Sequence, residues 1–264
     1  MRHLPGYAVW GLCALLVVGA SSLGQDPSPD PGPTDEQEAL ATVDSLRTAR
    51  EFRAALARLD ELSRRVDETV QVLWRQSILW SDLAKASDSE ARALTFNRQA
   101  LDVAETAVET DATHAWAHLA KSVAAGRMAT MTNSNRESIR LSREVKEHAD
   151  RALALDSELG AAYHVRARWH REVGDLNFVQ RLVVKTVYGG LPDASTARAV
   201  EDFRTAIGLE TRAYHHLELG KTYEKMDRRG DAVQQYRRAL EAPRADPFDP
   251  EYKREARAHL SELE

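Results

Sequence analysis

Apolar residues along most of the chain recur at the spacing of one face of an α-helix. In residues 51–67, Ala55, Leu59, Leu62 and Val66 lie three or four positions apart, with polar residues filling most of the positions between them. No segment gives the signal of a β-strand. The pattern therefore predicts an all-α protein of about ten helices, with residues 36–50 and 51–67 as the leading pair.

The helices near the C-terminus carry the pattern of a repeat. L-G-x-x-Y begins at Leu219, and A-x-x-x-Y-x-x-A begins at Ala232 after a polar turn. This is the tetratricopeptide pattern, in which small residues let two helices approach and aromatic residues fill the angle between them. Earlier helix pairs have small and aromatic residues at the equivalent positions, but more residues separate their two small positions. This predicts a tetratricopeptide-like α-solenoid with long intra-repeat insertions. The residues predicted to pack the repeats are Ala120, Ala167, Ala199, Phe203, Gly220, Tyr223, Ala232 and Tyr236.

The first residues form a different kind of segment. The run from Tyr7 to Ala20 is uncharged, and residues 25–35 hold four of the nine prolines. A short apolar run that ends in small residues is typical of a secretory signal, whereas its extension to Leu23 is just long enough for an anchor. We predict a signal peptide or N-terminal anchor at 1–24, a proline-rich tether at 25–35 and the repeat domain at 36–264. The protein is then exported (periplasmic or secreted), or membrane-anchored if residues 4–23 are retained.

The third helix pair after the leading one resembles a known family. Its distinctive positions are Arg168-Trp169, Glu172-Val173, Leu176, Gly189 (or Gly190), Pro192 and Ser195-Thr196. They are similar to the R-W-x-x-E-V-x-x-L segment, amphipathic helix and G-x-x-P-x-x-S/T turn of the regulator of microtubule dynamics proteins. The resemblance implies a non-enzymatic adaptor, whose eukaryotic members associate with microtubules and membranes. A microtubule role applies only in a eukaryotic host; an exported bacterial member keeps the repeat scaffold alone.

Charge and composition exclude several function classes. The chain has 36 basic and 41 acidic side chains, whereas a nucleic-acid-binding protein usually has a basic excess. Its single cysteine, Cys13, lies in the predicted signal and excludes Cys–His catalysis. The chain has no phosphate-binding Gly-rich loop, and His114 and His118 have no acidic third ligand at a metalloprotease spacing. We predict no catalytic residue, cofactor or metal.

The first helices of the repeats carry a row of basic side chains. In stacked helix pairs these helices line the concave face, where extended partners bind. The residues that we predict to bind a partner are Arg75, Lys121, His164, Arg168, Arg171, Lys221 and Lys225. Such a row would attract an acidic protein or peptide, although lysine and arginine are also common on any solvated helix face.

Residues 176–188 leave a second function open. Apolar residues recur from Leu176 to Val187 at helical spacing, and Arg181 and Lys185 mark the other side. Such a helix could lie on a membrane, which would make the protein membrane- or lipid-associated. Its few basic residues and its lack of tryptophan favour packing instead, so we expect it in the groove or along the third helix pair.

Overall fold

The computed structural model describes residues 35–65 and 69–264, which form twelve helices and no strand. The predicted signal or anchor and nearly all of the tether lie outside the described residues. The first six helices are α1 (Asp35–Thr48), α2 (Phe52–Arg65), α3 (Val70–Lys85), α4 (Glu90–Thr110), α5 (Ala115–Met131) and α6 (Asn135–Leu155). The others are α7 (Gly160–Gly174), α8 (Phe178–Tyr188), α9 (Thr196–Leu209), α10 (Ala213–Lys225), α11 (Arg229–Glu241) and α12 (Asp249–Leu263).

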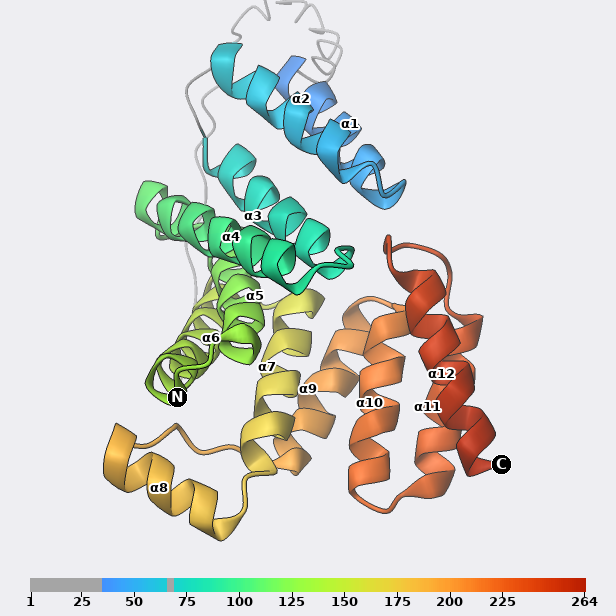
Figure 1. Cartoon of the computed structure of the whole chain (residues 1–264). Coiled ribbons are helices and arrows are strands. Elements are labelled where there is room, and N and C mark those ends of the chain that lie inside the picture. Colours follow the sequence, from blue (N-terminus) through green and yellow to red (C-terminus); the bar gives the residue numbers. More distant parts are fainter. Residues whose placement is uncertain (1–34, 66–68) are drawn as a thin grey trace, which may run out of the picture. The chain divides into compact units, whose positions relative to one another are not determined.

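The helices pack in consecutive antiparallel pairs (Figure 1). The pairs are α1/α2, α3/α4, α5/α6, α7/α9 and α10/α11, and α12 packs on α11. The prediction of an all-α, tetratricopeptide-like fold is therefore confirmed. The described residues hold twelve helices rather than about ten, because residues 178–188 and the C-terminal residues each add one.

The repeats accommodate their extra residues in two ways. In the first two repeats the extra residues lengthen the second helix, so that α4 and α6 have 21 residues each. Ser89 and Ser134 start these helices by accepting a hydrogen bond from a backbone N–H of the first turn. In the third repeat the extra residues form α8 instead. An Asn177–Gln180 capping box begins α8, and Gly189 ends it with a φ of 79°, which favours glycine.

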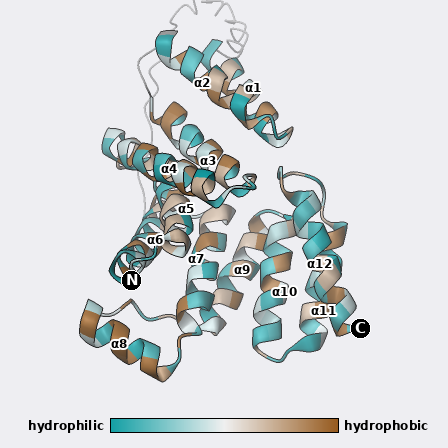
Figure 2. Ribbon diagram, viewed as in Figure 1, coloured by the Kyte–Doolittle hydropathy of each residue, from teal (hydrophilic) through white to brown (hydrophobic). Residues whose placement is uncertain are grey.

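The expected packing of residues 176–188 is wrong. Phe178 is 79% exposed and Val183 is 45% exposed, and no residue of α8 is buried. Figure 2 shows the apolar residues of α8 on a helix that stands apart from α7 and α9. The space between α7 and α9 is already filled, because Ala167, Ala199 and Phe203 pack there directly.

Small residues set the spacing both between and within the pairs. Ala100 and Ala104 of α4 pack against Ala120 and Ala124 of α5, and all four are fully buried. In the last repeat a Cβ added to Gly220 would lie 2.5 Å from Cε1 of Tyr236. All eight residues predicted to pack the repeats are buried: Ala120, Ala167, Ala199, Phe203, Gly220, Tyr223, Ala232 and Tyr236.

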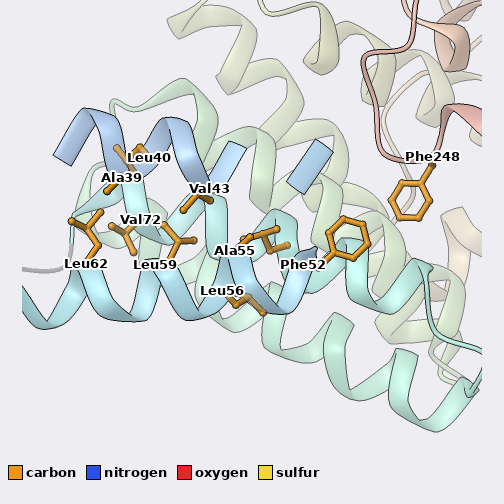
Figure 3. Close-up of a cluster of buried hydrophobic side chains, with 11 residues drawn as sticks. Ala39, Leu40, Val43, Phe52, Ala55, Leu56, Leu59, Leu62, Val72 and Phe248 are labelled. Atoms are coloured by element: carbon orange, nitrogen blue, oxygen red, sulfur yellow. The ribbon is translucent and has the colours of Figure 1, made fainter. Parts of the chain in front are cut away.

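The first helix pair contacts the segment that leads into α12. Phe248 stacks on Phe52 with ring centroids 5.8 Å apart (Figure 3). Arg50, which precedes α2, donates a hydrogen bond to the carbonyl oxygen of Pro247 at 3.3 Å and pairs with Glu251. Residues about two hundred positions apart therefore share one apolar cluster.

Candidate functional site

The first helices of the repeats line a cavity of about 900 Å³. Its wall consists mainly of residues from α1, α3, α5, α7 and α10 and from the segment 245–252. Of the second helices, only α6 contributes to the lining, through Ser142 and Val145. This volume lies within the range of pockets that hold ligands.

Aromatic residues form part of this wall. Trp74 of α3 and Trp116 of α5 stack with ring centroids 4.7 Å apart, and Trp116 is 37% exposed. Trp169 of α7 is buried and donates its indole N–H to the carbonyl oxygen of Ser142 at 2.7 Å. The exposed indole of Trp116 gives a ligand an apolar surface to cover.

Every carboxylate that lines the cavity has a cationic partner within 4 Å. The pairs are Asp44–Arg75 at 3.0 Å, Asp82–Arg47 at 2.7 Å, Glu172–Arg171 at 2.9 Å, Glu210–Arg212 at 2.8 Å, Glu218–Arg171 at 2.6 Å and Asp246–Arg47 at 3.7 Å. Arg171 and its companions also hold the pKa of Glu218 far below its usual range, against the effect of its burial. These six carboxylates share four arginines, so each has an ion-pair partner within the protein but the pairing is not one to one.

Two cations of the wall have no carboxylate partner among the described residues. The ammonium of Lys85 lies 4.1 Å from the ring centre of Phe248 and donates to the Tyr252 hydroxyl at 2.5 Å. Partial desolvation and the charge of Arg127 lower the pKa of Lys85 to about 8. The guanidinium of Arg127 makes no hydrogen bond or ion pair with any described residue, and burial lowers its pKa, against the charge of Asp82. Sequence reasoning missed both residues.

One signal in the sequence could have pointed to Arg127. It is the only charged residue in the C-terminal half of α5, within the small and apolar stretch 122–131. An arginine in such surroundings either pairs with a distant carboxylate or serves a ligand. Lys85 gives no comparable signal, because a lysine in the last turn of a helix is common.

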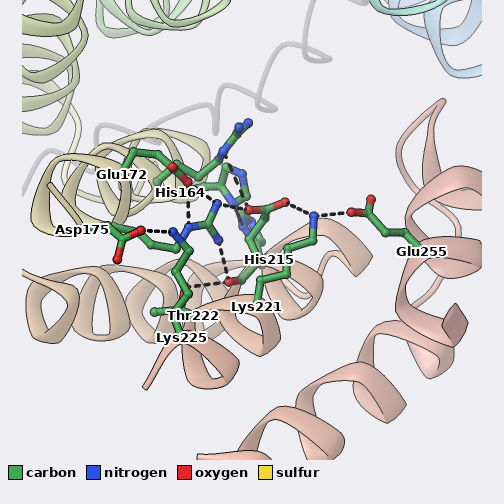
Figure 4. Close-up of polar contacts among 11 residues, drawn as sticks. His164, Glu172, Asp175, His215, Lys221, Thr222, Lys225 and Glu255 are labelled. Carbon is green, nitrogen blue, oxygen red and sulfur yellow. Dashed lines mark hydrogen bonds and ion pairs between the residues drawn. The ribbon is translucent and has the colours of Figure 1, made fainter. Parts of the chain in front are cut away.

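The structure does not bring the seven predicted partner-binding residues together. Arg75, His164 and Arg168 line the cavity, whereas the other four do not. Those four are held by carboxylates of the protein: Lys121 by Glu105, Arg171 by Glu218, Lys221 by Glu218 and Glu255, and Lys225 by Asp175. Figure 4 shows the contacts of Lys221 with Glu255 and of Lys225 with Asp175.

Among the three cavity residues, Arg168 is the most available cation. Its side chain is 55% exposed and lies 3.8 Å from Glu218, which Arg171 already contacts. Arg75 is engaged by Asp44. His164 is buried, with its Nδ1 3.0 Å from Nδ1 of His215. Burial and His215 hold the pKa of His164 well below its usual range, so His164 is neutral near pH 7.

The described residues give little support for a metal ion or a membrane span. Within residues 35–65 and 69–264, no cluster of three or more histidine, cysteine or acidic side chains is arranged to ligate a metal. Over the same ranges, no helix combines the length and the apolar character that crossing a bilayer requires.

Comparison with known proteins identifies relatives over most of the chain. Residues 39–264 match the family described as regulator of microtubule dynamics protein 1-3. Regulator of microtubule dynamics protein 1 of Caenorhabditis elegans is 24% identical over 224 residues, which are 84% of this chain and 98% of the relative. Protein 1 of Mus musculus is 24% identical over 196 residues, which are 72% of this chain and 63% of the relative.

Other relatives are longer, and one solved structure has the same fold. Regulator of microtubule dynamics protein 3 of Bos taurus is 24% identical over 194 residues, but the match covers 40% of it. The chain thus spans less than two thirds of the length of these two mammalian relatives. A tetratricopeptide repeat protein of Thermus thermophilus superposes with a TM-score of 0.64 at 15% identity, covering 86% of this chain and 99% of that one.

Proposed function

The chain belongs to the regulator of microtubule dynamics protein 1-3 family, and from that premise we propose that it is a non-enzymatic adaptor that binds a partner protein in its cavity. The observation that carries the proposal is the cavity of about 900 Å³ on the first helices, with the exposed face of Trp116 in its wall. Interfaces commonly place such an aromatic anchor at their centre. Asp82 and Glu218 of the cavity are bound to arginines, which makes them poor proton donors for catalysis.

The names of the relatives indicate a class of partner. They are described as regulators of microtubule dynamics. We extend that role to this chain in a eukaryotic host, where the partner is the microtubule or a protein bound to it. Co-sedimentation of the full chain with polymerised tubulin tests this part of the proposal, and a chain that stays in the supernatant contradicts it.

Site-specific photocrosslinking in cells of the source organism tests the cavity itself. A benzoylphenylalanine at Trp116, in the cavity wall, should capture one partner protein covalently. The matched control is the same group at Leu209, which is also exposed but lies on α9, outside the cavity. The captured band should disappear when Thr130→Trp, at the cavity wall, fills the space. Equal capture from both positions, or none at Trp116, contradicts the proposal.

The exposure of α8 favours a second function, association with a lipid surface. Phe178, Leu182 and Val187 are 79%, 48% and 61% exposed, an arrangement typical of helices that lie in a membrane interface. Lys185 stands on the same helix and has no ion pair with a described residue. Sedimentation with anionic vesicles tests this function. Leu182→Asp should abolish pelleting, whereas Leu209→Asp, at a similarly exposed leucine of α9, should not.

We further propose that residues 1–24 direct export or anchor the protein. The uncharged run from Tyr7 to Ala20 supports this localisation. Residues 1–35 fused to a reporter that is active only outside the cytoplasm should give activity. Leu15→Arg, which interrupts the apolar run, should remove that activity, and a reporter that is inactive with the parent segment contradicts the proposal.

A further inference from the structure

We infer that the cavity recognises an acidic peptide segment, whose carboxylates pair with Lys85, Arg127 and Arg168. The inference rests on the proposed function, since it specifies the chemistry of the partner that enters the same cavity. Only Arg168 belongs to the basic row that the sequence indicates.

These three cations are the ones in the cavity wall that no carboxylate holds closely. Asp44, Asp82, Glu210 and Asp246 are taken by Arg75, Arg47 and Arg212, which line the cavity with them. Glu172 and Glu218 are taken by Arg171, which does not line the cavity. Arg168 reaches Glu218 only at 3.8 Å, and Lys85 and Arg127 have no carboxylate within 4 Å among the described residues.

The three cations come from successive first helices and act on one another. Lys85 ends α3, Arg127 lies in the second half of α5, and Arg168 lies in α7. Arg127 lowers the pKa of Lys85, after the larger effect of desolvation. Arg168 also lowers the pKa of Arg127, after desolvation and against the charge of Asp82. Like charges at a partly desolvated wall repel one another, and a bound anion removes that repulsion.

Hydrogen-bond donors next to the cations are also unused. The hydroxyl of Ser81, one turn before Lys85, is buried in the cavity wall and has no partner. Tyr214 of α10 also lines the cavity, and its hydroxyl makes no hydrogen bond with a described residue. A buried polar group without a partner costs free energy, so such groups are usually reserved for a ligand or water.

The volume of the cavity and the aromatic residues in its wall favour a peptide over a small ion as the ligand. An inorganic anion would leave most of the roughly 900 Å³ unfilled. The stacked rings of Trp74 and Trp116 add an apolar surface that a side chain next to the acidic residue would cover. An acidic side chain flanked by apolar ones matches both features of the wall.

Two peptide libraries test the inference with the full chain. In one library, short peptides carry adjacent glutamates between apolar residues; in the other, glutamine replaces each glutamate. Fluorescence anisotropy should show binding to the acidic library alone, and the binding should weaken as salt is added. Arg127→Gln should lower the affinity roughly ten- to a hundred-fold, because a charge-assisted hydrogen bond is lost. The control is Arg151→Gln, at an exposed arginine of α6 outside the cavity, which should change nothing.

A melting temperature distinguishes a ligand-binding arginine from a structural one. Without peptide, Arg127→Gln should keep or raise the melting temperature, because it removes a desolvated charge that has no partner. A lower melting temperature means that Arg127 stabilises the fold, which contradicts the inference. Equal binding of both libraries also overturns it but leaves the adaptor function standing. Binding of neither library contradicts the adaptor function as well.

Discussion

At the scale of single residues, the last repeat depends on the absence of a side chain at Gly220. A Cβ there would lie 2.5 Å and 2.8 Å from two ring carbons of Tyr236, which is itself fully buried and stacked on His259. The motif spacing predicted that Gly220 and Tyr236 both pack this repeat, because helix geometry within one repeat brings them together.

The contact gives a prediction with a matched control. Gly220→Ala should overpack the α10–α11 contact and cost about 1–3 kcal/mol, which lowers the melting temperature by roughly 2–12 °C. Gly230→Ala should leave it unchanged or slightly higher, because a Cβ at Gly230 meets no atom within 4 Å. Thermal unfolding followed by circular dichroism measures both variants. Equal melting temperatures would contradict the packing of Gly220 on Tyr236.

His148 makes stability depend on pH. Burial, followed by the charges of His118 and Lys121, lowers the pKa of His148 to about 4, whereas an unfolded histidine has a pKa near 6.5. Between these values the unfolded chain binds more protons, so stability is complete above about pH 6.5 and falls as the pH drops towards 4. One such proton contributes at most about 1.4 kcal/mol per pH unit.

Chemical denaturation at pH 7.5 and pH 5 measures this dependence. His148→Gln should reduce the loss of stability between the two pH values. A loss of the same size in the parent and in the variant would show that His148 does not titrate in this range.

At the scale of elements, α8 shows where the sequence pattern misleads. Its apolar spacing predicts an amphipathic helix, and residues 178–188 do form one. Whether α8 is buried depends on whether the neighbouring interface has room for it. Ala167, Ala199 and Phe203 already fill the α7–α9 interface without α8. Periodicity reports which face of a helix is apolar, but it does not report whether another element covers that face.

The exposure of α8 gives a prediction opposite to the one from its sequence. Val183→Asp should change the free energy of unfolding by no more than about 0.5 kcal/mol, because the valine is already 45% exposed. Val200→Asp, at a buried valine of α9, should cost more than about 3 kcal/mol, because it buries an unpaired charge. Urea denaturation measures the free energy of unfolding of both variants. A large loss for Val183→Asp would mean that α8 packs on the domain.

At the scale of the whole described domain, the candidate site combines residues from several repeats. The sequence indicates that first helices carry basic residues, but it does not show which of them are already paired. Lys121 is neutralised by Glu105 and Lys225 by Asp175, and each partner lies on a different element. The motif defines geometry within a repeat, whereas the free charges at Lys85 and Arg127 depend on how successive repeats face one another.

The contact between Phe52 and Phe248 should couple the first helix pair to the C-terminal segment. Repeat proteins otherwise carry interactions between neighbours only. Phe248→Ala should cost about 3–5 kcal/mol and accelerate amide hydrogen exchange in α1 and α2, because Phe248 is buried against Phe52 and Arg50. Phe178→Ala, at an exposed phenylalanine of α8, should alter neither quantity. Unchanged exchange in α1 and α2 after Phe248→Ala would mean that this contact does not stabilise the first pair.

The same contact sets the order in which the cavity can be completed during translation. Each repeat can pack on its predecessor as the chain leaves the ribosome, since neighbouring helices are close in sequence. Phe248 and Tyr252, which hold Lys85 at the cavity wall, are synthesised after all of α1–α11. The hydrogen bond from Arg50 to Pro247 joins residues 197 positions apart. A nascent chain therefore displays folded repeats before its cavity wall is finished, and the proposed partner capture is expected only after α12 has been released.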